Sequence, residues 1–320
     1  MTTSQKRIGI AVQGRDAADV LAGIRQAEEM EIPAAWLTAG GANRDSLSVL
    51  VAAAVQTERI MLGTSIVPIW PRHPIALSQQ AHVLAQLAPG RFRLGVGPGH
   101  GARVESTYGL DFQAPLGHLK EYVQVLKAIL EKGAVEFHGR YYHADWRIEE
   151  RVEVPVMVSA LRQRSFELAG AEADGAISWV CPGVYLRDVA IPAMEAGARG
   201  AGRPTPPLVA HAPVCVHDDP QEIQTAAREQ LGGYPRQPFY AQMFQQAGFP
   251  EAAEGAWSDA MLDAVLLSGD EGRVEERLRE LLAFGATEIV VSPVMAGDDR
   301  DASLQRTLDL VASVARSMTV

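Results

Sequence analysis

Residues 59–101 carry the pattern that most limits the fold of this chain: two apolar runs rich in β-branched residues, with a helical segment between them. Residues 60–67 and 92–96 are predicted to be buried strands. Between them, apolar residues from 75 to 87 recur at helical spacing, and Pro89-Gly90 predicts the turn that follows. Two buried strands joined by a helix form a right-handed βαβ unit with parallel strands.

The alternation of strand and helix continues along the chain. Eight apolar runs lie near residues 8, 34, 60, 92, 154, 176, 208 and 288, and each is followed by a helical segment. This count, in a chain of 320 residues, favours a (β/α)8 TIM barrel over an open doubly wound sheet. Ligand sites of such barrels gather in the loops at the carboxyl ends of the strands.

Two segments interrupt the alternation and are interpreted as insertions in the loops after strands four and seven. Residues 133–152 predict a short hairpin, and residues 232–270 predict two amphipathic helices. The second insertion would lie at the carboxyl ends of the strands and could cover the site as a helical lid. Because no shift in composition marks a linker, we expect residues 1–320 to form a single domain.

Composition and charge exclude several classes of protein. The net charge of −10 argues against a surface for nucleic acid or for an anionic membrane. No apolar stretch is long enough for a membrane span, and the apolar run near the N-terminus is too short for a signal peptide. Cys181 and Cys215 form no CxxC motif, which is typical of buried, reduced thiols in a cytoplasmic protein.

The glycine-rich segment Gly95-Val96-Gly97-Pro98-Gly99-His100 looks like a dinucleotide-binding fingerprint but fails it. The third glycine of that fingerprint would fall at His100, and Pro98 interrupts the turn. A Rossmann site for NAD is therefore rejected. The glycines would still let a flat group approach the backbone closely, or they form only a tight turn.

Other candidate motifs are few. Arg162 and Arg164 follow a strand at a helix start, where they could hold a phosphate together with the helix amides or be solvated surface residues. His138 and His143 are too loosely spaced to indicate a metal site, and none is expected. No nucleophile motif is present.

A family resemblance adds to this pattern. The segment that carries it is TERIMLGTSIVPIWPRHPIALSQQAHVLAQLAPGRFRLGVGPG, with GTS after strand three, RHP before the next helix and GRFRLGVG leading into the following loop. This segment resembles the core of the bacterial luciferase-like superfamily of flavin and deazaflavin oxidoreductases. The chain is most similar to the branch that uses coenzyme F420, which includes methylenetetrahydromethanopterin reductase and a glucose-6-phosphate dehydrogenase. The likeness continues at residues 155–175 and weakens across residues 232–270.

The resemblance implies a (β/α)8 barrel with the cofactor across the carboxyl ends of the strands. It places a non-proline cis peptide at Ser65-Ile66 against the flat ring, and the loop after strand four at the polar edge of the ring. The backbone amides of residues 159–162 would hold the phosphate, although Leu161 and Arg162 are larger than the usual family residues. The implied cofactor-binding residues are Thr38, Ala39, Ser65, Ile66, Pro98, Gly99, His100, Ser159, Ala160, Leu161 and Arg162.

One departure from the branch concerns proton transfer. The sugar-phosphate dehydrogenases carry an acidic residue and a histidine after strand two, where this chain has Ala39 and Gly40, and an acidic residue where this chain has His100. We therefore do not expect that substrate or that acid/base pair. His100 becomes the candidate catalytic residue, as a proton donor or acceptor, or it contacts the ring without a proton role.

Together these features predict an F420-dependent oxidoreductase that moves a hydride between the deazaflavin and an organic substrate. The first alternative is an FMN-dependent luciferase-like monooxygenase that uses reduced flavin and oxygen. The second is a non-catalytic protein that binds a flavin or deazaflavin. The resemblance also implies a homodimer that acts on a small molecule.

Overall fold

Eight parallel strands close into a barrel in the computed structural model, which describes residues 6–38 and 44–319. Each strand pairs with the next in chain order, and β12 closes the ring by pairing with β1. The eight strands predicted from the sequence are therefore confirmed. They are β1 (Arg7–Ala11), β2 (Ala34–Leu37), β3 (Met61–Thr64), β5 (Phe92–Gly97), β8 (Val156–Ser159), β9 (Gly175–Trp179), β10 (Leu208–Val216) and β12 (Glu288–Pro293).

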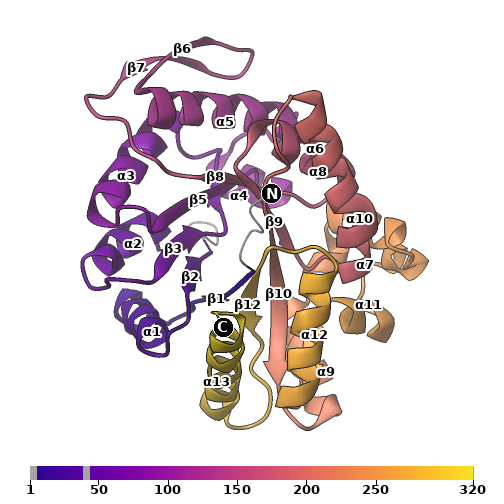
Figure 1. Ribbon diagram of the computed structural model, residues 1–320. Coiled ribbons are helices and arrows are strands. Elements are labelled where there is room, and N and C mark those ends of the chain that lie inside the picture. Colours follow the sequence, from indigo (N-terminus) through magenta and orange to yellow (C-terminus); the bar gives the residue numbers. More distant parts are fainter. Residues whose placement is uncertain (1–5, 39–43, 320) are drawn as a thin grey trace.

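Helices surround the barrel on its outer side (Figure 1). The main helices between successive strands are α1 (Ala17–Glu29), α2 (Ser46–Ala54), α3 (Pro74–Leu87), α5 (Pro115–Lys132), α6 (Gln163–Glu172), α8 (Ile191–Gly200), α12 (Glu271–Ala283) and, after the last strand, α13 (Arg300–Thr319). Short α7 (Gly183–Tyr185) and a π-helical turn, η1 (Leu186–Ala190), lead into α8. Within the described ranges, no helix is long and apolar enough to cross a membrane.

The region predicted as one strand at residues 60–67 differs in detail. It consists of β3 and a second short strand, β4 (Val67–Pro68), and the Ser65–Ile66 peptide between them is cis. A further helix, α4 (Gly101–Tyr108), follows β5 where the sequence indicated only a loop. Val104 is its one buried residue, so α4 has no apolar stripe that could have revealed it.

Both insertions are present. The first is the antiparallel hairpin of β6 (Ala134–His138) and β7 (His143–Arg147), which lies beside α5 at the top of Figure 1. After β10 comes α9 (Pro220–Leu231), the helix predicted near residues 221–231. The second insertion follows it as η2 (Tyr234–Arg236), α10 (Pro238–Gln246), η3 (Pro250–Glu254) and α11 (Asp259–Val265). The short strand β11 (Leu267–Gly269) then pairs with the end of β10, ahead of α12. The second insertion thus falls within the predicted range of residues 232–270.

The barrel interior has its own apolar core, separate from the layer between strands and helices. It comprises Ala11, Ala34, Trp36, Met157, Ile177, Val209 and Val290, with Ile66 and Met61 packed against it. Side chains of a strand alternate between its two faces, so these residues share the inward face of their strands. The interior is thus filled by side chains below the carboxyl ends of the strands.

Candidate functional site

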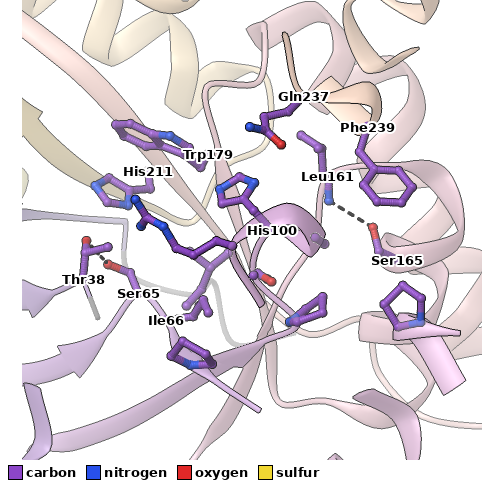
Figure 2. Close-up of a pocket in the computed structure, with 18 of the residues that line it drawn as sticks. Thr38, Ser65, Ile66, His100, Leu161, Ser165, Trp179, His211, Gln237 and Phe239 are labelled. Carbon is purple, nitrogen blue, oxygen red and sulfur yellow. Dashed lines mark hydrogen bonds between the residues drawn. The ribbon is translucent and has the colours of Figure 1, made fainter. Parts of the chain in front are cut away.

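A pocket of about 1670 Å³ opens above this interior core, at the carboxyl ends of the strands. Ten of the residues predicted to bind the cofactor line it: Thr38, Ser65, Ile66, Pro98, Gly99, His100, Ser159, Ala160, Leu161 and Arg162. Figure 2 shows several of them around the pocket. The eleventh, Ala39, lies outside the described residues. The structure thus brings the predicted residues to one pocket, and their binding roles stay predictions.

The floor of the pocket is formed by the end of β3 and the loop after β5. The hydroxyls of Thr38 and Ser65 lie 3.4 Å apart, and Ile66 packs onto the interior core. A Cβ at Gly97 would lie 2.1 Å from Ser159 Oγ, so any larger residue there would require Ser159 to move. Gly99 has a φ of +67° and open space beside it. A flat group can therefore approach the backbone at this loop.

His100 stands at the N-terminus of α4, half-buried in the pocket wall. Its ring centroid lies 6.0 Å from those of Tyr234 and Tyr240. Burial, and then the positive charge of Arg103, lower the pKa of His100 below its ordinary value of 6.5. The imidazole is therefore neutral at pH 7 and has an unprotonated nitrogen that can accept a proton.

The second insertion contributes to the pocket directly. Tyr234 of η2, with Gln237, Phe239 and Tyr240 at the start of α10, lines the pocket opposite the strand ends. Burial raises the pKa of both tyrosine hydroxyls, so they remain protonated. These residues, with Trp179 and His211 of the barrel wall, were not identified as site residues from the sequence. Only their positions in the sequence could have indicated them: Trp179 is the last residue of a strand, and Tyr234 lies near the start of the insertion that follows a later strand.

The segment predicted to hold a phosphate already uses most of its amides. Ser165 Oγ accepts hydrogen bonds from the amides of Leu161 and Arg162, both at 3.0 Å, and donates to the Arg162 carbonyl. The Ala160 amide donates to the Ile177 carbonyl. The next amides, of Gln163 and Arg164, lie in the first turn of α6, where a helix supplies no acceptor. They are the better candidates for an anion, beside the Arg162 side chain, whose buried Nε has no hydrogen-bond partner in the part of the chain that the structure describes.

Replacing Ser165 with alanine should loosen this loop. The variant loses the oxygen that accepts hydrogen bonds from two amides, and it loses the hydroxyl that donates to the Arg162 carbonyl. We therefore expect the free energy of unfolding to fall by about 1–2 kcal/mol. Urea denaturation followed by circular dichroism measures the change. Ser106→Ala is the matched control, since Ser106 makes a single exposed bond at 3.4 Å. Equal stabilities of the two variants would contradict the role of Ser165.

Positive side chains gather around the pocket, although the protein is acidic overall. Arg44, Arg103, Lys120, Arg162 and Arg164 line it, against Glu167 and Glu172. Glu172 is paired with Lys120 at 3.2 Å. The lining therefore favours an anionic ligand, which the net charge of the chain alone does not indicate.

Comparison with known proteins identifies the family. The model of the luciferase-like monooxygenase family matches residues 1–288. The chain belongs to this family. The luciferase-like resemblance inferred from the sequence is thereby confirmed, and so is the prediction that the protein is an oxidoreductase of this kind.

Two relatives show how much of this luciferase-like chain is similar to known enzymes. A 5,10-methylenetetrahydromethanopterin reductase of Methanopyrus kandleri is 26% identical over an alignment of 330 positions, gaps included, which covers 88% of this chain and 90% of the relative. An F420-dependent glucose-6-phosphate dehydrogenase of Microbacterium testaceum is 34% identical over 177 residues, which cover 52% of each chain. The similarity to the reductase thus extends over nearly the whole chain, and that to the dehydrogenase over half.

Solved structures of luciferase-like proteins share the fold. An F420-dependent secondary alcohol dehydrogenase, in complex with an F420-acetone adduct, superposes with a TM-score of 0.79 at 19% identity and covers 98% of this chain and 99% of its own. The F420-dependent tetrahydromethanopterin reductase of M. kandleri gives 0.75 at 24% identity, covering 98% of both. The FMN complex of a 3,6-diketocamphane monooxygenase constituent from Pseudomonas putida gives 0.70 at 19%, also covering 98% of both. These likenesses confirm the barrel architecture.

Proposed function

We propose that this protein is an F420-dependent oxidoreductase that moves a hydride between the deazaflavin and a small organic substrate. The observation that carries the proposal is the similarity to the M. kandleri reductase over 88% of this chain, since the solved tetrahydromethanopterin reductase of that organism is F420-dependent. Similarity to F420-dependent glucose-6-phosphate dehydrogenases over half of the chain supports the same cofactor.

The residues of the pocket fit such a group. The ring would lie on Ser65, Ile66 and the loop of Pro98 and Gly99, where glycines leave the backbone accessible. The anionic tail would lie toward the start of α6, near the Gln163 and Arg164 amides and the Arg162 Nε, which has no partner within residues 6–38 and 44–319. When bound, coenzyme F420 supplies a two-electron hydride acceptor or donor.

The chain itself supplies orientation, exclusion of water and a proton site. Tyr234 and Tyr240 cover the pocket on the side of the second insertion, so we extend the proposal to this segment as a lid. Oxidation of an alcohol removes a proton as well as a hydride, and the unprotonated nitrogen of His100 would take the proton. The homodimer implied by the resemblance stays a prediction.

Separate titrations with coenzyme F420 and with FMN test the cofactor. We expect F420 to bind at least tenfold more tightly, because five cationic side chains line the pocket and its tail carries more negative charge than the single phosphate of FMN. Quenching of cofactor fluorescence measures both affinities. Preference for FMN would favour the monooxygenase alternative, with oxygen consumption as the next assay, and binding of neither would contradict both.

A further inference from the structure

His211 lies in the middle of β10 and faces the inside of the barrel. It follows Val209 of the interior core by two residues, so strand alternation directs both side chains inward. In register it pairs with Trp179 of β9, and the two ring centroids are 4.4 Å apart. Figure 2 shows these two rings at one end of the pocket, with Leu161 and Ser165 toward the other.

The imidazole of His211 is an unusual buried group. The residue is 6% exposed, and its Nε2 has no hydrogen-bond partner among the described residues. Buried polar atoms are almost always partnered, because an unmade hydrogen bond in a low-dielectric site costs free energy. Since His211 lines the pocket, a molecule bound there can supply the missing hydrogen-bond partner.

The ring neighbours of His211 are aromatic. The Trp179 ring lies 5.8 Å from that of Tyr234, which in turn lies 4.9 Å from Tyr240. Burial lowers the pKa of His211 to about 3, so its imidazole is neutral. The neutral imidazole offers one N–H donor and one bare nitrogen, which suit a carbonyl or a hydroxyl.

We propose that His211 Nε2 holds an uncharged oxygen of the substrate, with Trp179, Tyr234 and Tyr240 enclosing its apolar part. The substrate class is then a neutral carbonyl compound or alcohol with an aromatic or aliphatic body. This inference rests on the proposed function, and it assigns the substrate end of the same pocket. A carboxylate or phosphate is disfavoured at His211 itself, because the neutral imidazole supplies no positive charge to offset the desolvation of an anion.

A matched series of probes tests the assignment: acetophenone, 1-phenylethanol, ethylbenzene and benzoate. Calorimetry or saturation-transfer NMR on the F420-saturated protein measures their binding. We expect at least one of the two neutral oxygen-bearing probes to bind about tenfold more tightly than ethylbenzene and benzoate. His211→Phe, which keeps the size and aromatic packing, should remove that advantage and leave ethylbenzene unaffected. His211→Gln, which restores an N–H donor, should retain most of it.

The outcomes separate this inference from the proposed function. F420 affinity, followed by fluorescence quenching, should change less than about twofold in His211→Phe, because no part of the proposed ring site involves this side chain. Loss of F420 affinity with unchanged probe binding would mean that His211 contacts the cofactor, and would overturn the substrate assignment alone. Equal binding of oxygen-bearing probes and ethylbenzene to the unaltered protein would overturn it as well. Failure of F420 to bind the unaltered protein would instead count against the proposed function.

Discussion

Replacing His100 with alanine should lower kcat by about 100-fold or more, because proton transfer by a positioned side chain contributes on the order of 10²–10⁴ to a rate. His100 is the titratable residue at the loop after β5, and burial keeps its imidazole neutral. Turnover is followed by the absorbance of F420, with the member of a secondary-alcohol panel that the unaltered protein oxidises fastest. His100→Asn is the matched variant, since it keeps a polar side chain without a titrating nitrogen.

The pH dependence distinguishes a proton role from a mere ring contact. A base must be unprotonated to act, so activity is present above the pKa of His100 and is lost as the pH falls through it. Because that pKa is lowered below 6.5, we expect the acidic limb of the kcat profile below pH 6.5. Arg103 contributes to the lowering through its charge, so Arg103→Gln should move the limb to higher pH.

The alternative role of His100 gives a different result. If the imidazole only contacts the ring, His100→Ala weakens F420 binding, and kcat at saturating cofactor keeps the same pH profile. A limb that stays in place in Arg103→Gln would also argue against the proton role. Fluorescence titration of both variants with F420 separates binding from turnover.

The strands could be predicted from the sequence because each is buried on both faces. Such strands are continuous apolar runs, and each of the eight predicted runs contains a strand of the barrel. The hairpin of β6 and β7 was also predicted. In contrast, α4 was missed, because it buries only Val104 and has no apolar stripe. Patterns of apolar residues show which segments are buried, but they do not show which other segments they pack against.

The site was predictable only where the family resemblance supplied the residues. Ser65, Ile66, Gly99 and His100 were expected at the pocket and line it. His211 was not, because it lies in an apolar run that indicates nothing beyond a buried strand. Its unpartnered Nε2 and its contact with Trp179 depend on the pairing of β9 with β10, which no local pattern encodes.

A charged cluster inside the barrel was not predicted from the sequence either, and its loss should have a large effect on the free energy of unfolding. Arg93 and Glu288 form two hydrogen bonds of 2.6 and 2.9 Å, across 195 positions of sequence. Trp36 Nε1 donates to the same carboxylate at 3.0 Å, and the Arg93 guanidinium lies 4.5 Å from the centre of the Trp36 ring. The side chains of Arg93 and Glu288 are 11% and 5% exposed, so both charges are buried.

Glu288→Leu should lower the free energy of unfolding by about 3–5 kcal/mol, because it leaves the Arg93 charge buried without its partner. The double variant Arg93→Met/Glu288→Leu removes both charges and should recover most of the loss. Glu275→Ala is the control: its bond to Arg279 joins exposed residues one helical turn apart, and its removal should cost less than about 0.5 kcal/mol. Chemical denaturation measures all three variants. A double variant as unstable as Glu288→Leu would show that the cluster stabilises the barrel through the fit of its side chains around Trp36 and not through its paired charges.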